Sequence, residues 1–291
     1  MNIKDLLINI NPSKKSLEFL ADRILSDNYR GNHISQHFRY NMDDVIAILQ
    51  ILYEVSGDDL LRIRTTDNSK RPSNTPEERD YAILVHKVNQ KISKCGQDSL
   101  RKNMFPDMHR MGLINRYGED KQVKGPYEKG VKSYVSLTEI GKKIIDPNLK
   151  YFDKYALYTD AINKLTHDLP TEILDVIIEN GYVYEDEFMF FLTFIGEEIN
   201  GQYYTKDMIN ELLKDYRSLE RFQRIEVNRI VKDYCNPKNF DGNKKNKRDY
   251  HNWKNETQQI FTLLSQTIYY SFDNTNQRLS PRIDQRLFSF L

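Results

Sequence analysis

The chain has 291 residues, a formal net charge of +1 at pH 7 and 39% hydrophobic residues. This length can bury a sizeable core and indicates two domains or three small ones. A net charge near zero excludes a globally basic protein, so any nucleic-acid surface must come from local segregation of charge.

The cysteines and the N-terminal segment indicate the cellular compartment in which we expect the protein. Cys95 and Cys235 are the two cysteines and form no Cys-x-x-Cys motif, which argues for a reducing compartment and against a zinc ribbon. The start of the chain is charged and broken at Pro12, unlike a signal peptide. No apolar run approaches the roughly 20 residues of a membrane span. We therefore expect a cytoplasmic protein with no membrane partner.

Residues 1–74 are expected to form a helical N-terminal segment. Leu17, Leu20 and Ile24 recur at helical spacing. A further helix should begin at an Asn or Asp cap and end at Gly57. A polar loop with two prolines then closes the segment.

Residues 75–147 are expected to form a first winged-helix-like unit. One helix should begin with Thr75 as its N-cap and end at Gly96. The next should be interrupted or restarted at Pro106 and end at Gly112. Two helices, a two-stranded wing and a short final helix are the layout of a winged helix-turn-helix.

The wing of this unit is predicted from a strand, a turn and a second strand. The turn is rich in Gly, Pro and Lys, and the second strand contains Tyr134, Val135 and Leu137. A short helix capped by Thr138 should come next, with Glu139 close behind the cap.

Residues 148–291 are expected to form a second helical, winged-helix-like unit. Helices should end at Gly181 and Gly196, followed by a long helix broken once, a basic loop and a further helix. A short hairpin through Leu279 and Ile283 should come last. The predicted fold class is mainly α, with winged-helix-like units, small β-wings and a helical N-terminal segment.

One segment matches a metal-dependent nuclease motif by letter, with Pro106-Asp107 followed by Glu119 and Lys121. In that chemistry the two carboxylates hold Mg²⁺ and the lysine orients the attacking water. The motif needs neighbouring strands, whereas Asp107 falls in a predicted helix and Glu119 follows a turn signal at Gly118. We favour a solvated wing tip here, and a complete small PD-(D/E)xK-like endonuclease is the alternative.

Other catalytic patterns are weaker. His33 and His37 stand at i, i+4 but lack the glutamate of a metalloprotease between them. We expect surface or core histidines there and predict no metal site. The acidic residues around Glu185 are expected to be the solvated start of a helix, where acids suit the helix dipole.

Basic residues gather in two segments attached to the winged-helix-like outlines. A run of charge is commonly a solvated loop, but this attachment favours DNA, because Lys and Arg contact phosphates while Asn and Arg read purine edges. The candidate DNA contacts of the first segment are Arg101, Lys102, Asn103, His109, Arg110, Arg116, Lys124 and Lys132. Those of the second segment are Lys244, Lys245, Lys247, Arg248 and Lys254. We therefore expect double-stranded DNA binding that weakens steeply with salt and needs no cofactor.

From about Asp98 to Ile283 the chain resembles the DNA-recognition region of type IIS restriction and nicking endonucleases of the AlwI sort, with a FokI-like organisation. The resemblance rests on "DSLRKNMFPDMHRMGLINRYG", on "SYVSLTEIGKKII" and on the order of the later parts. It implies sequence-specific recognition within a type II restriction endonuclease.

In that family a separate nuclease domain of the Pro-Asp...(Asp/Glu)-x-Lys type follows the recognition region and uses Mg²⁺. We expect no room for that domain after Ile283. The resemblance therefore implies a recognition portion that acts with a separate nuclease domain or subunit, and no catalytic residue is carried over. A winged-helix transcriptional regulator or protein–protein module is the remaining alternative.

Overall fold

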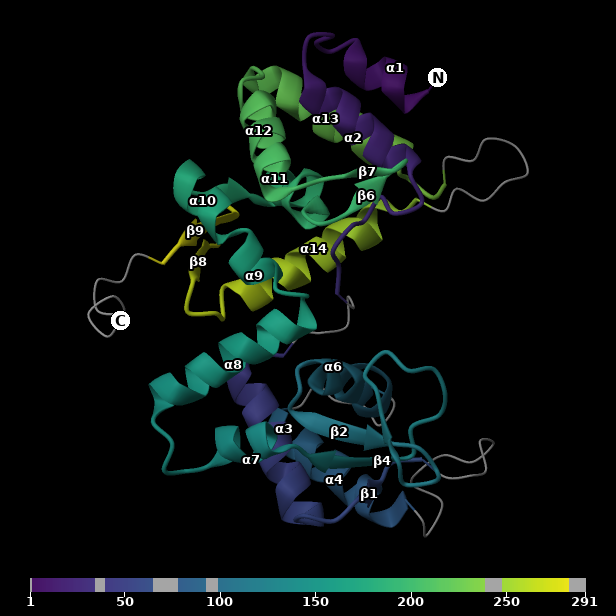
Figure 1. Ribbon diagram of the computed structural model, residues 1–291, viewed down its shortest axis with the longest axis vertical. Coiled ribbons are helices and arrows are strands. Elements are labelled where there is room, and N and C mark those ends of the chain that lie inside the picture. Colours follow the sequence, from purple (N-terminus) through teal and green to yellow (C-terminus); the bar gives the residue numbers. More distant parts are fainter. Residues whose placement is uncertain (1, 35–39, 65–77, 93–98, 239–247, 283–291) are drawn as a thin grey trace. The chain divides into compact units, whose positions relative to one another are not determined.

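The computed structural model describes residues 2–34, 40–64, 78–92, 99–238 and 248–282 (Figure 1). The chain is mainly helical with small antiparallel sheets, which confirms the expected mainly-α class. No helix in the described ranges is long and apolar enough to cross a membrane.

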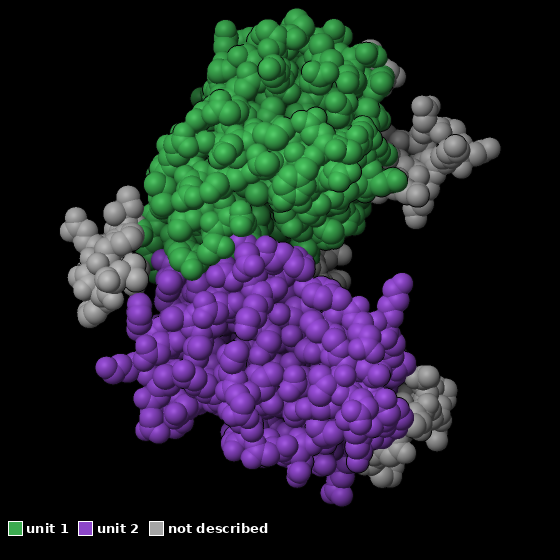
Figure 2. Space-filling view, viewed as in Figure 1, with its two compact units in different colours: residues 1–36, 169–265, 269–291 green, residues 37–168, 266–268 purple. Residues whose placement is uncertain are grey.

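The chain divides into two compact units, coloured separately in Figure 2. Unit 1 comprises residues 1–36, 169–265 and 269–291, and unit 2 comprises residues 37–168 and 266–268. Unit 1 is therefore discontinuous in sequence, because unit 2 lies between its first two parts.

Unit 2 combines helices with one small sheet. Its helices are α3 (Met42–Ser56), α4 (Arg79–Ile92), the π-helix η3 (Leu100–Met104), α6 (Phe105–Arg110), α7 (Glu139–Ile145) and α8 (Tyr151–Leu165). Its strands are β1 (Leu61–Arg62), β2 (Ile114–Tyr117), β3 (Val123–Lys124) and β4 (Tyr134–Leu137).

The expected helix boundaries of unit 2 follow from local capping. Asn41 and Asp44 form a capping box at the start of α3, and Gly57 ends it with a φ of 57°. Pro106 lies in the first turn of α6, which continues directly from the π-helix η3. The expected ends of α4, Thr75 and Gly96, lie outside the described residues.

The sheet is antiparallel in the order β1-β4-β2-β3. The two strands expected in this region are β2 and β4, which pair with each other, and a two-residue strand is added on each side. Arg116 on β2 lies opposite Val135 on β4 and Lys124 on β3, and Arg62 on β1 lies opposite Tyr134. Directly opposite residues share a face and successive residues alternate, so Arg116 and Tyr134 are on opposite faces of the sheet.

A polar junction joins the end of α6 to the start of α7. Thr138 Oγ1 accepts a hydrogen bond from Gly141 N over 3.0 Å and donates to Gly112 O over 2.7 Å. Gly141 packs so closely that a Cβ there would lie 2.1 Å from Leu113 O. The Thr-x-x-Gly spacing therefore caps α7 and also seats it against the turn before β2.

Unit 1 has more helices and two smaller sheets. Its helices are α1 (Ile3–Ile8), α2 (Lys15–Leu25), α9 (Leu169–Glu172), α10 (Leu174–Asn180), α11 (Glu185–Phe190), the 3-10 helix η4 (Leu192–Phe194), α12 (Lys206–Arg217), α13 (Arg221–Tyr234) and α14 (Tyr250–Leu264). The sheet orders are β5-β9-β8 and β6-β7. The strands are β5 (Val183–Tyr184), β6 (Glu198–Ile199), β7 (Gln202–Tyr203), β8 (Tyr270–Asp273) and β9 (Arg278–Pro281).

These elements confirm the long helix broken once, as α12 and α13. The late hairpin through Leu279 is β8 and β9, while Ile283 lies outside the described residues. The core of unit 1 also holds a buried arginine. Arg23 on α2 donates to the carbonyls of Tyr29 and Phe190 over 2.7 and 2.9 Å, and its guanidinium lies 5.1 Å from the Trp253 ring centroid. Burial lowers the pKa of Arg23 to about 9.

Candidate nucleic-acid interface

The π-helix η3 carries three of the expected DNA contacts. Lys102 is exposed and Arg101 and Asn103 are half-buried, whereas Leu100 and Met104 are buried. The apolar residues thus anchor η3 and leave its basic face toward solvent.

Four further candidates come together although they lie on different elements. His109 and Arg110 are on α6, Arg116 is on β2, and Lys132 precedes β4. Burial and the charges of Arg116, Lys132 and Arg110 lower the pKa of His109 to about 4. We call His109, Arg110, Arg116 and Lys132 the basic cluster.

Arg116 is the member contributed by the sheet. Burial, with the charge of Arg110, lowers its pKa to about 10. Lys124 lies directly across the ladder from it, an arrangement of like charges that disfavours pairing. Lys124 is offset by Asp120 and Glu128, at 3.6 and 3.5 Å from its ammonium.

One carboxylate faces the basic cluster from within α6. Arg110 Nη1 lies 2.9 Å from Asp107 Oδ1, and Asp107 is only 2% exposed. Burial raises the pKa of Asp107 to about 6 in spite of the opposing charge of Arg110. Asp107 therefore balances part of the positive charge around it.

Four buried side-chain atoms here make no hydrogen bond to any described residue. They are Asp107 Oδ2, His109 Nδ1, Arg110 Nε and Arg116 Nε. Buried polar atoms without partners are uncommon in folded proteins and require an explanation. Two of the four are guanidinium N–H donors, which suit an anionic ligand.

Two aromatic rings border the basic cluster. The guanidinium of Arg110 lies 5.6 Å from the ring centroid of Tyr127, and Tyr127 stacks on His167 with centroids 5.6 Å apart. Sequence reasoning missed both residues. Tyr127 falls in the Gly- and Lys-rich turn, which gives no local sign that the ring returns to α6.

The residues that match the nuclease motif, Asp107, Glu119 and Lys121, do not lie on one face of the sheet. Glu119 Oε1 lies 2.6 Å from Arg62 Nη2, and the Lys121 ammonium lies 5.9 Å from the centroid of the Tyr134 ring. Both contacts are on the Tyr134 face, whereas Asp107 pairs with Arg110 beside Arg116. Among the described residues no group of three or more His, Cys, Asp or Glu could hold a metal ion.

The second basic segment is only partly described. Lys244, Lys245 and Lys247 lie outside the described residues. Arg248 donates to the carbonyls of Ile24 and Leu25 at the end of α2, an internal role that satisfies the helix end.

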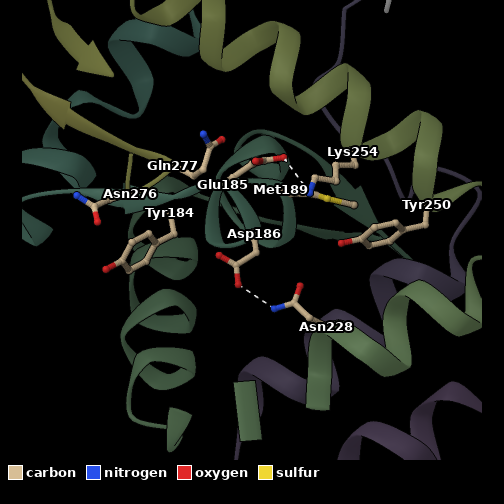
Figure 3. Close-up of a pocket in the computed structure, with 9 residues that line it drawn as sticks. All are labelled: Tyr184, Glu185, Asp186, Met189, Asn228, Tyr250, Lys254, Asn276 and Gln277. Atoms are coloured by element: carbon tan, nitrogen blue, oxygen red, sulfur yellow. Dashed lines mark hydrogen bonds and ion pairs between the residues drawn. The ribbon is translucent and has the colours of Figure 1, made fainter. Parts of the chain in front are cut away.

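Lys254 lines a polar cavity of about 310 Å³ in unit 1, drawn in Figure 3. Its ammonium lies 3.8 Å from Glu185 Oε1, and Asn228 Nδ2 donates to Asp186 Oδ2 over 2.9 Å. Figure 3 shows each carboxylate turned toward its partner. Burial raises the pKa of Glu185. Two pairs of polar groups thus interact within this cavity, while Glu185 Oε1 makes no hydrogen bond to a described residue.

The expectation of a solvated helix start around Glu185 is wrong. Glu185 has 12% of its side chain exposed and Glu187 has 1%. Glu187 Oε2 and Oε1 accept from Arg217 Nη2 and Nε over 2.6 and 2.9 Å. The acids do begin α11, but Glu187 is buried against Arg217, a partner 30 residues away in sequence.

His33 has a structural partner. Its Nδ1 lies 2.7 Å from Gly31 O, and the ring is part-buried. His37 lies outside the described residues. Cys235 is buried, and burial raises the pKa of its thiol to about 12, which suits an unreactive core cysteine.

Residues 41–148 match the family model described as the type IIS restriction enzyme MboII middle domain. The match falls within unit 2 and contains α3, the sheet, α6, α7 and the whole basic cluster. Searches of curated proteins and of solved structures found no match.

Proposed function

We propose that this chain recognises a specific sequence in double-stranded DNA as part of a type II restriction endonuclease. Unit 2 would carry the recognition as a winged-helix-like module. Cleavage would be Mg²⁺-dependent phosphodiester hydrolysis by a nuclease domain or subunit that the described residues do not reveal. The organisation would be FokI-like, as in the enzymes of the AlwI sort, with Mg²⁺ serving cleavage rather than binding.

The observation that carries this proposal is the basic cluster inside the matched region. The match associates residues 41–148 with type IIS restriction enzymes. Within it, cations converge from α6, β2 and the segment before β4, and two buried guanidinium N–H groups make no hydrogen bond to a described residue. Local positive charge is what a protein with a net charge of +1 needs in order to bind DNA.

The small-nuclease alternative has less support. Asp107 and Glu119 each engage a different arginine, and the sheet lies between their surroundings. A Mg²⁺ site needs carboxylates that converge on one position. We therefore assign Asp107 to the support of Arg110 and Glu119 to the support of Arg62.

A binding and cleavage assay against random duplex pools tests the proposal. The whole chain should shift a subset of duplexes at moderate salt, and sequencing of that subset should give a short common site. Binding should not require Mg²⁺, and binding without cleavage by this chain is expected. Cleavage that Glu119→Ala and Lys121→Ala abolish without loss of binding would establish the small nuclease instead.

Two variants locate the interface in the same assay. Lys102→Gln on η3 should weaken binding because it removes an exposed cation from the proposed recognition face. Lys143→Gln removes an exposed cation from α7, outside η3 and the basic cluster, and should change binding less. Equal effects of the two would mean that the unit binds DNA through general charge alone.

A further inference from the structure

We propose that the basic cluster of unit 2 is a seat for one backbone phosphate of the duplex, and that it positions the protein without reading bases. This inference rests on the proposed function and assigns a role to one part of the site. The exposed face of η3 is then left as the element that reads sequence.

The first argument is the convergence of charge. His109 lies within the influence of Arg110, Arg116 and Lys132, and Lys132 is itself affected by Arg116 and Arg110. Asp107 is the carboxylate paired with Arg110 over 2.9 Å. The cations Arg110, Arg116 and Lys132 outnumber the carboxylates that act on them, Asp107 and Glu128, and one phosphate diester would reduce this excess of positive charge.

The second argument is the presence of unused donors. Arg110 Nε and Arg116 Nε are buried and donate to no described residue. A phosphate has several oxygens in a tetrahedral array and accepts charge-assisted hydrogen bonds from guanidinium groups on different sides. Such a ligand would satisfy two donors that are left without a partner among the described residues.

The third argument is the restricted reach of Arg110. An arginine that reads a base must extend into a groove about 8.5 Å deep. Arg110 has 35% of its side chain exposed, and its guanidinium is held between Asp107 and the ring of Tyr127. A guanidinium held by two neighbouring side chains is poorly placed to extend to a base edge, whereas phosphates project from the surface of the duplex and can approach it.

The fourth argument is rigidity. Tyr127 stacks on His167, and the Tyr127 hydroxyl lies 3.3 Å from His167 Nε2. Lys132 Nζ donates to Glu128 O over 2.6 Å, which ties the same loop to the cluster. Because Arg110 and Lys132 are already held in place, their part in binding would cost little side-chain entropy.

The test compares Arg116→Gln with Lys143→Gln, each in the full chain. Binding is measured by fluorescence anisotropy with the duplex enriched from the random pool and with a scrambled duplex, over about 50–200 mM salt. Arg116→Gln should weaken binding to both duplexes by the same factor, on the order of 10-fold, and lower the salt slope by about one phosphate contact. Lys143→Gln should alter neither the affinity nor the slope by a comparable amount.

A loss of affinity confined to the enriched duplex would overturn the inference, because it would make Arg116 a base reader. Unchanged binding by Arg116→Gln would also overturn it, while the proposed function would survive. If wild-type protein binds no duplex at moderate salt, the proposed function itself fails. Lys132→Gln, at a more exposed position, provides the same comparison if Arg116→Gln does not fold.

A measurement without DNA separates the phosphate seat from the recognition proposal. In protein with labelled histidines, inorganic phosphate should shift the ring resonances of His109, since an anion among the three cations favours the protonated ring. Arg116→Gln should reduce this shift, and His109→Gln identifies the signal. Ring resonances that do not respond to phosphate would overturn the seat even if the chain binds DNA.

Discussion

Arg110 and Asp107 stand one turn apart on α6, with Arg110 Nη1 2.9 Å from Asp107 Oδ1. The carboxyl that matches the nuclease motif by letter is thus the buried support of an arginine. Its neighbour His109 is buried on the same helix, and the pKa values of the two groups are displaced in opposite directions. Their contributions to stability therefore have opposite pH dependence.

Asp107→Asn should stabilise the protein at neutral pH. The pKa of this carboxyl rises from 3.8 to about 6 on folding. It therefore contributes most to the stability of the folded protein below pH 3.8, and that contribution is lost as pH rises through about 6. A permanently neutral amide avoids the loss, so the free energy of unfolding at pH 8 should rise by up to ~3 kcal/mol. Urea denaturation at pH 5 and pH 8 measures this, and lower stability of the variant at pH 8 would contradict it.

His109→Gln should make the protein less sensitive to acid. The pKa of the His109 ring falls from 6.5 to about 4 on folding. Its contribution to the stability of the folded protein is therefore present above pH 6.5 and is lost as pH falls toward 4. Across this pH window the free energy of unfolding of the glutamine variant should fall by up to ~3 kcal/mol less than that of wild type. Thermal unfolding at pH 7 and pH 4.5 tests this, with the exposed His251→Gln as the control for removal of an imidazole. An identical pH dependence in His109→Gln and wild type would refute it.

Gly141→Ala should destabilise unit 2. The new Cβ would lie 2.1 Å from Leu113 O. This is a backbone atom, so the overlap cannot be relieved by rotation of a side chain. Helix α7 would have to move from its seat, at a cost of about 1–3 kcal/mol. Gly125→Ala is the matched control, because its Cβ would meet nothing nearer than 3.7 Å. A melting temperature of Gly141→Ala no lower than that of the control would show that α7 is not held in this way.

Glu187→Ala should strongly destabilise unit 1. The change leaves Arg217 part-buried without the carboxylate that accepts two of its hydrogen bonds. Breaking a buried pair from one side costs about 3–5 kcal/mol. Glu226→Ala removes an exposed carboxylate from its ion pair with Arg229 and should have little effect. Chemical denaturation of both variants gives the comparison, and similar losses would argue against a special role for the buried pair.

Helices and their ends were predictable because their signals are local. Asn41, Gly57 and Thr138 each act on backbone groups within a few residues. The strands β1 and β3 were not predicted, since two residues carry no alternation pattern. The sequence suggested divisions at 74/75 and 147/148 from loops and prolines, whereas the compact units divide at 36/37 and 168/169.

The sequence singles out the basic residues of the candidate site but not their arrangement. His109, Arg110, Arg116 and Lys132 stand out as basic residues, but only the β2–β4 register places Arg116 on the face opposite Tyr134. The burial of Glu187 depends on Arg217, 30 residues later, and the position of Tyr127 depends on the path of a loop. Contacts between residues this far apart in sequence produce no periodic pattern from which they could be predicted.

The discontinuity of unit 1 affects how the protein is made. Helix α2 packs against α12, with Ser16 N donating to Asp215 Oδ2 over 2.9 Å. The ribosome adds roughly 5–20 residues each second, so α2 must wait roughly 10–40 s for α12 to be synthesised. Unit 2 is nearly complete within that interval and can fold first. The nascent N-terminal helices, with their apolar faces uncovered, are therefore the segment of this protein for which a chaperone would matter most.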